Sequence, residues 1–154
     1  MTTKDDALAR IVEIVDSYHG IPHPAELGVL YELRRELSVA RVELSRHVKA
    51  AYGRKALTYV QRKWVIAKSM SDAIKAETGK GRAVEKYKAD AEALDEVRDL
   101  NNHLSDAEAA WEEVHEMLRS TDAVLNAMQQ EITDARKEQD YQNHLGLLQK
   151  RNQP

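Results

Sequence analysis

The sequence predicts an all-α protein, a long antiparallel helical hairpin of the coiled-coil type with a short N-terminal helix folded against it. The first observation behind this prediction is a pair of apolar ladders with a seven-residue repeat. One ladder comprises Leu104, Trp111, Leu118, Leu125 and Ile132, and the other comprises Ala107, Val114, Thr121, Met128 and Ala135. Such an a/d seam is typical of a helix that lies along another helix.

Composition is the second observation. The 154 residues include only six Gly and three Pro, no Phe, two Trp and six Tyr. Few glycines and prolines suit long helices, and few aromatic side chains suit a thin seam better than a thick core. The length is that of one ordinary domain, so we expect a single helical domain over residues 1–154.

Several classes of protein are excluded. The chain has no Cys, which rules out disulfide bonds and thiolate metal sites. The N-terminal residues MTTKDDALAR lack the apolar region of a signal peptide. No window approaches the length of apolar sequence that spans a membrane. We therefore expect a cytoplasmic protein with no membrane contact.

The first helix is expected over residues 4–18. Its apolar face comprises Leu8, Ile11, Val12 and Val15. Gly20 suits the position after this helix, and Pro22 and Pro24 disfavour helix in the residues before them. Pro24 is also able to open the next helix.

A long helix is expected over residues 25–77. Its seam comprises Leu30, Leu37, Leu44 and Ala51, with Leu33 and Ala40 between them. After Ala51 this register decays, and a second stripe takes over that comprises Tyr52, Tyr59, Ile66 and Ala73. Either a stutter in the seam or a bend in the helix accounts for this shift.

The run from Thr78 to Arg82 predicts the reversal of the hairpin, because Gly79 and Gly81 can supply positive φ. A second long helix is expected over residues 83–138, followed by a frayed tail or short separate helix over residues 140–154. Folding about residue 80 would place residue i beside residue 160 − i.

Charge is strongly segregated along the chain. Residues 34–88 carry 15 basic and 5 acidic side chains, whereas residues 89–154 carry 6 basic and 15 acidic ones. The hairpin would bring these segments together, so much of the segregation is explained by pairs across the seam. Each exposed pair contributes only about 0–1 kcal/mol, yet the pattern fixes register and orientation.

Cations and aromatic residues interleave on the first long helix. The candidate contact residues for nucleic acid or a partner are Arg54, Lys55, Tyr59, Arg62, Lys63, Trp64, Lys68, Lys80 and Arg82. Cations neutralise phosphates and aromatic faces stack on unpaired bases, so this mixture fits single-strand binding. Two other interpretations are an amphipathic helix whose cations are solvated or paired internally, and a surface for an acidic protein.

Two further surfaces follow from the seams. The stripe of Tyr52, Tyr59 and Ile66 is the candidate surface for self-association, because a hairpin of this length buries little area per residue. Trp111 lies on the seam and is expected to be buried. Trp64 lies on neither stripe, and if exposed it would mark a contact surface.

No enzyme motif is present. Gly79 and Gly81 do not form the G-x-x-x-x-G-K-[ST] loop of nucleotide-binding proteins. No carboxylate or Cys completes a metal set with His19 and His23. The acidic helix has one Glu-x-x-His pair, Glu112 with His115, and not the two pairs that di-iron bundles use. No G-x-S-x-G nucleophile is found. We expect no enzyme activity, no metal and no cofactor.

The two long segments carry a resemblance. The first has Ala51-Tyr52, Ala56, Arg62-Lys63 and Ala67-Lys68, and the second has Ala107-Glu108, Trp111, Leu118-Arg119-Ser120, Leu125 and Met128-Gln129. Over roughly residues 30–137 the chain thereby resembles small helical proteins of tailed bacteriophages, although the Gly79-Lys80-Gly81 turn departs from their pattern. The resemblance implies a phage origin, the host cytoplasm, and a setting near recombination and replication.

These observations support two functional hypotheses. The first is a non-enzymatic interaction or assembly module, self-associating, that binds a protein partner through the hairpin. The second is an accessory nucleic-acid-binding protein of phage recombination or replication, with residues 54–82 as its contact surface.

Overall fold

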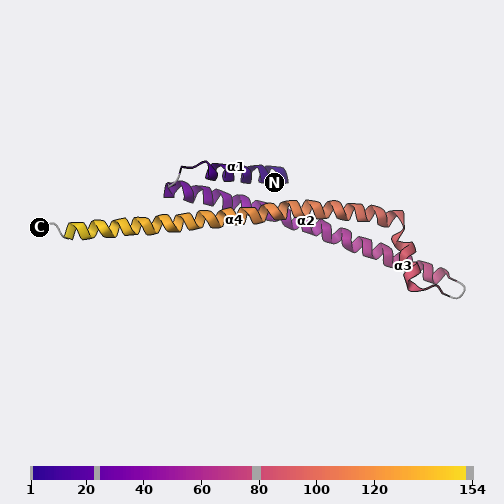
Figure 1. Cartoon of the computed structure of the whole chain (residues 1–154). Helices are drawn as coiled ribbons and strands as arrows, with labels where there is room; N and C mark the ends of the chain where they lie inside the picture. The colour runs from indigo at the N-terminus through magenta and orange to yellow at the C-terminus, as the bar shows by residue number, and fades with distance from the viewer. Residues whose placement is uncertain (1, 23–24, 78–80, 152–154) are drawn as a thin grey trace. The chain divides into compact units, whose positions relative to one another are not determined.

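The computed structural model describes residues 2–22, 25–77 and 81–151, with side chains described up to residue 146. His23, Pro24, Gly79 and Lys80 lie outside the described residues. The helices are α1 (Lys4–His19), α2 (Leu27–Ala76), α3 (Val84–Glu92) and α4 (Asp95–Arg151), as Figure 1 shows. No strand occurs in the described ranges, so the all-α prediction is confirmed.

The packing divides the chain into two compact units. Unit 1 comprises residues 1–46 and 116–154, and unit 2 comprises residues 47–115. Unit 1 therefore contains α1, the beginning of α2 and the end of α4, and unit 2 contains the remainder. In each unit α2 and α4 pack against each other, which is compatible with a hairpin. The single domain and the self-association both stay predictions.

Helix α1 begins at a complete capping box. The Thr3 side chain accepts a hydrogen bond from the backbone N–H of Asp6, and the Thr3 backbone N–H donates to the Asp6 carboxylate, both at 3.1 Å. These contacts satisfy two backbone donors that a helix start otherwise leaves unpaired. The Thr3 side-chain hydrogen bond also lowers the pKa of Asp6.

The core of unit 1 lies where α1, α2 and α4 meet. Its buried residues are Ala7, Ile11, Ile14 and Tyr18 of α1, Leu30, Leu37, Ala40 and Leu44 of α2, and Thr121, Met128 and Ile132 of α4. The seam predicted for the start of α2 is thus confirmed at Leu30, Leu37 and Leu44. The predicted face of α1 is partly wrong, because the buried stripe turns toward Ile14 and leaves Val12 exposed.

Polar contacts link the helices of unit 1. The Tyr18 hydroxyl donates to Glu131 at 2.5 Å, and burial together with this hydrogen bond raises the pKa of Tyr18 to about 12. The Arg41 guanidinium donates two hydrogen bonds to Asp122, one of them at 3.1 Å. The hydrogen bonds from Arg41 lower the pKa of the Asp122 carboxyl.

Unit 2 has a thinner core. Its buried residues are Ala51, Val65, Tyr87, Ala91, Val97 and Val114. Trp111 is only half-buried, so its predicted burial is wrong. Its ring stacks on His115 at 4.8 Å and lies 6.4 Å from the Tyr52 ring, centroid to centroid. A large indole in so thin a seam reaches the edge of the helix pair and remains partly open to water.

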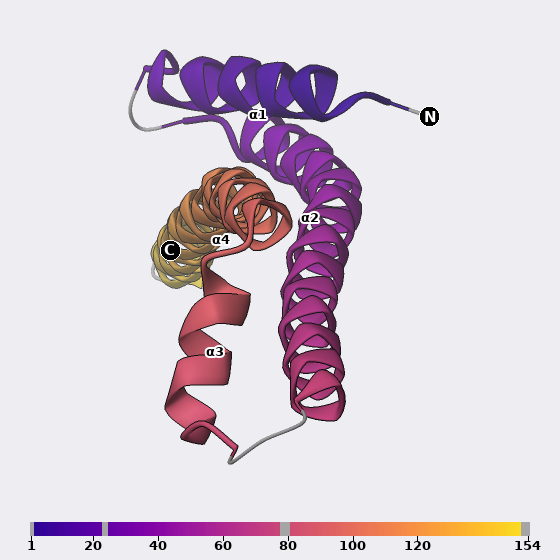
Figure 2. The ribbon, with the colours of Figure 1, turned by 90° about the vertical axis from the view of Figure 1, so that its right-hand side faces the viewer.

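The prediction of one helix over residues 83–138 is right at its start, but it is wrong in its interior, where the helix is interrupted, and at its C-terminal end. Helix α3 ends at Glu92, and α4 begins at Asp95, running in a different direction, as Figures 1 and 2 show. Asp95 and Glu96 favour this start because carboxylates stabilise the positive end of a helix dipole. The bend buries Tyr87 and Ala91 of α3.

The tail predicted over residues 140–154 is also different from the structure. Helix α4 continues through Gly146 to Arg151, so the tail belongs to α4 as far as the described residues extend. One glycine costs a helix only about 1 kcal/mol relative to alanine, which a long helix can absorb.

The register of the two long helices differs by almost one turn from the prediction. Arg41 pairs with Asp122 in unit 1, and Lys55 pairs with Glu108 in unit 2. Each acidic partner lies three positions further along the chain than folding about residue 80 would place it. The interruption between α3 and α4 explains the difference, because α4 does not continue the helical phase of α3.

Candidate functional site

Two of the predicted contact residues face into unit 2. The Lys55 ammonium lies 3.3 Å from the Glu108 carboxylate and 4.4 Å from the centre of the Trp111 ring. Arg62 donates a hydrogen bond to the side-chain oxygen of Asn101 on α4. Both cations thus serve the contact between α2 and α4, as the internal-pairing interpretation predicts.

Arg82 holds the connection between α2 and α3. Its guanidinium lies 2.7 Å from Asp90 and 3.6 Å from Glu77, and 4.8 Å from the Tyr87 ring centre. The Tyr87 hydroxyl accepts a hydrogen bond from the Arg82 backbone at 3.1 Å and donates to Glu77. This cluster links the end of α2 to α3. The φ of Gly81 lies outside the left-handed region, so the positive φ predicted there is wrong, and Gly79 lies outside the described residues.

Three predicted contact residues remain exposed cations on α2. They are Arg54, Lys63 and Lys68. The Lys63 ammonium lies 4.6 Å from the centre of the Tyr59 ring, and the Lys68 ammonium lies 5.0 Å from that of Trp64. A lysine thus lies over one face of each ring, which leaves the other face and the edges for contact with a partner.

The predicted self-association stripe does not form one free surface. Tyr52 and Tyr59 are exposed, but Ile66 is half-buried. The Tyr52 ring also contacts Trp111 within unit 2. The three residues lie on the flank of α2, between the seam with α4 and the outer face.

The outer face of α2 in unit 2 carries a different apolar stripe, which sequence reasoning missed. Its large members are Leu57, Val60, Trp64 and Ile74, with 59%, 60%, 61% and 49% of their surface exposed. Gly53, Ala67 and Ser71 complete it and are exposed too. We call these seven residues the outer stripe.

The outer stripe has the spacing of a second coiled-coil seam. Its members alternate steps of four and three residues from Gly53 to Ile74, so that Leu57, Trp64 and Ser71 take a positions. The d positions hold Gly53, Val60, Ala67 and Ile74. This alternation is present in the sequence, but the ladder toward α4 overlaps it there, and only burial separates the two.

Cations border the outer stripe on both sides. The e positions hold Arg54, Gln61, Lys68 and Lys75, and the g positions hold Lys49, Ala56, Lys63 and Met70. All five cations are exposed, and none of them forms an ion pair with an acidic group among the described residues. The stripe therefore combines an apolar centre with a positive rim.

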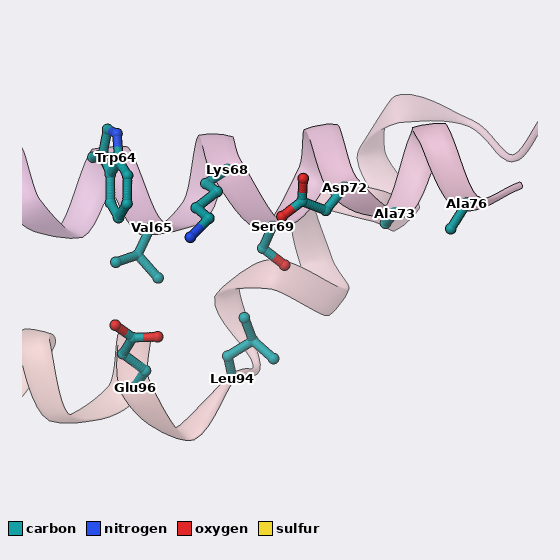
Figure 3. Close-up of a pocket in the computed structure, with 9 residues that line it drawn as sticks. All are labelled: Trp64, Val65, Lys68, Ser69, Asp72, Ala73, Ala76, Leu94 and Glu96. Atoms are coloured by element: carbon teal, nitrogen blue, oxygen red, sulfur yellow. The ribbon is translucent and has the colours of Figure 1, made fainter.

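A shallow groove lies beside the stripe. It has a volume of about 520 Å³ between α2 and the start of α4, and Figure 3 shows its residues. Val65 points across it toward Glu96, whereas the Trp64 ring overlies α2 in this view. Polar side chains of both charges line the groove without converging on one point, so it does not resemble a small-molecule site.

The described part of the chain contains no group of His, Cys, Asp and Glu side chains able to hold a metal ion. Among the described helices, none combines the length and apolar character needed to cross a membrane. No family model, curated protein or solved structure matches the chain.

Proposed function

We propose that this protein is a non-enzymatic interaction or assembly module that docks a helical segment of another protein on the outer stripe. One observation carries the proposal: four large apolar side chains are exposed at a/d spacing on the side of α2 that does not face α4. Contiguous exposed apolar surface of this kind is characteristic of interaction sites.

The energetics favour a helical partner. Full burial of a large apolar side chain contributes roughly 1.5–3 kcal/mol, so covering four of them would contribute several kcal/mol to association. A helix laid along α2 meets the stripe at regular intervals because both have the same periodicity. The resemblance noted in the sequence suggests that the partner is a phage or host protein.

Site-specific photo-cross-linking tests the proposal. A photoreactive benzoylphenylalanine replaces Trp64 in the stripe or, as a matched control, exposed Glu112 on α4. The chain is then irradiated in the cells in which it naturally functions. We expect one defined protein to be captured from position 64 and not from position 112.

Substitutions in the stripe complete this test. Leu57→Gln with Val60→Gln should abolish the capture from position 64 and leave the helical circular dichroism unchanged, because both side chains are exposed. Equal capture from both positions, or capture that survives these substitutions, would contradict docking on the outer stripe.

Nucleic-acid binding is the second candidate, and the five exposed cations of the rim support it. Because Arg62 contacts Asn101, the informative variant is Lys63→Glu with Lys68→Glu. In this interpretation the wild type retards single-stranded DNA at low salt, the variant does not, and affinity falls linearly on a log–log salt plot. Absence of retardation of single- and double-stranded DNA by the wild type removes this candidate.

A further inference from the structure

We infer that the helix docked on the outer stripe is acidic, with an apolar seam flanked by Glu or Asp. This inference rests on the proposed function and names the chemistry of the partner. Its basis is the rim: the e and g positions beside the stripe hold five cations and no acidic residue. In coiled coils these flanking positions meet those of the partner and decide which partner is accepted.

The outer stripe of a second copy is not a suitable partner for the outer stripe of the first. In a parallel pair the e positions would face the partner's g positions, and in an antiparallel pair like positions would face each other. Either arrangement sets Lys63, Lys68 and their neighbours against cations, and like charges at such positions repel.

The acidic helix α4 of a second copy does not fit either. Tyr141 is the one large apolar side chain that is exposed on the described part of α4. Its outward positions near Trp111 include Glu112 and Glu116, which bring the right charge but no apolar seam. The occupant must combine both properties, which points to a different protein.

The shape of the stripe also favours a close helical neighbour. Small residues at Gly53, Ala67 and Ser71 alternate with the bulky Trp64 and Leu57. Around Gly53 no atom lies within 4 Å of the position that a Cβ would occupy, so the space there is open. A partner side chain can enter such a gap as a knob while Trp64 enters the partner's hole.

The test uses synthetic helical peptides about three heptads long, with Leu or Ile at a and d. One carries Glu at e and g, a second carries Lys there, and a third keeps the Glu residues but replaces the seam with Gln. The full chain carries Trp111→Phe, so that Trp64 is the only indole and its emission reports binding.

We expect the acidic apolar peptide to shift Trp64 emission to the blue and to bind at least about tenfold more tightly than the basic one. The peptide without a seam should not bind. Lys63→Glu with Lys68→Glu lowers the charge of the rim from +5 to +1 and should remove most of the preference. Lys86→Glu with Lys88→Glu, an equal charge change on exposed residues of α3, should leave it unchanged.

Several outcomes would overturn the inference. These are a basic peptide that binds as tightly as the acidic one, a single-stranded oligonucleotide that displaces the acidic peptide, or a blue shift that grows with protein concentration alone. If the acidic peptide fails while cross-linking from position 64 still captures a protein, the acidic chemistry is wrong and the docking stands. If both fail, the proposed function is wrong.

Discussion

Two single variants, Leu37→Ala and Leu57→Ala, distinguish the two apolar faces of α2. Leu37 belongs to the ladder that faces α4 and is 0% exposed, whereas Leu57 belongs to the outer stripe and is 59% exposed. Both lie inside the same helix, so the change in chemistry is the same and only the surroundings differ.

The expected magnitudes follow from burial. Removing a fully buried leucine side chain costs about 2–5 kcal/mol, because transfer energy is lost and a cavity remains. At position 57 most of the side chain already contacts water, and alanine is at least as good a helix former as leucine. We therefore expect Leu37→Ala to lose about 2–5 kcal/mol and Leu57→Ala to change stability by less than about 0.5 kcal/mol.

Urea denaturation followed by circular dichroism measures both free energies of unfolding. The reasoning is refuted if Leu57→Ala is as destabilising as Leu37→Ala. That result would mean that the outer stripe is already buried in solution, most directly by a second copy of the chain.

Three other predictions concern single positions. Gly53→Ala should raise the free energy of unfolding by roughly 0.5–1 kcal/mol, since its Cβ meets open space and alanine favours helix; a lower midpoint in urea would show that the site is not open. Burial and the Glu131 contact raise the pKa of Tyr18 from 10.0 to about 12 in the folded state. Its contribution to the free energy of unfolding, at most about 2.7 kcal/mol, is therefore present below pH 10 and is lost toward pH 12, as the unfolded chain ionises first. Tyr18→Phe should remove that part of the alkaline loss in melts at pH 9 to 12, and an unchanged pH dependence would contradict the Glu131 contact. Asp122 has a lowered pKa, so its pair with Arg41 stabilises above about pH 4 and fades as the pH falls through the folded pKa. Because both side chains are partly exposed, Arg41→Gln should cost under about 1 kcal/mol at pH 7 and less at pH 3, and an equal loss at both values would count against the pair.

The sequence predicted the fold where an apolar ladder keeps one register. Leu30, Leu37 and Leu44 repeat every seven residues, and burial follows that repeat because this side of α2 faces the core that it shares with α1 and α4. The ends of α1 and α2 were also predicted closely, because the residues between them include a glycine and prolines.

The bend between α3 and α4 could not be predicted from local signals. Ala93 and Leu94 lie in the gap, and both are strong helix formers with neither glycine nor proline beside them. Tyr87 and Ala91 are buried just before the interruption, and local sequence does not report such tertiary packing. The same interruption moved the register of α4, which local periodicity does not report.

The predicted contact residues and the outer stripe lie on the same stretch of α2 but differ in composition. The basic segment of α2 was recognised, yet the structure turns Lys55 and Arg62 toward α4 and leaves Trp64 outward. Adjacent apolar residues such as Trp64 and Val65 lie about 100° apart on a helix, so they serve different faces. Only burial shows which of them belongs to the core.

The most direct test of the central claim is the accessibility of Trp64 in the isolated protein. Acrylamide quenching of the Trp111→Phe chain, repeated over a dilution series, reports on that single indole. An unpartnered outer stripe predicts emission typical of an exposed indole, strong quenching, and no dependence on protein concentration. Blue-shifted emission that resists the quencher without any added partner would contradict it.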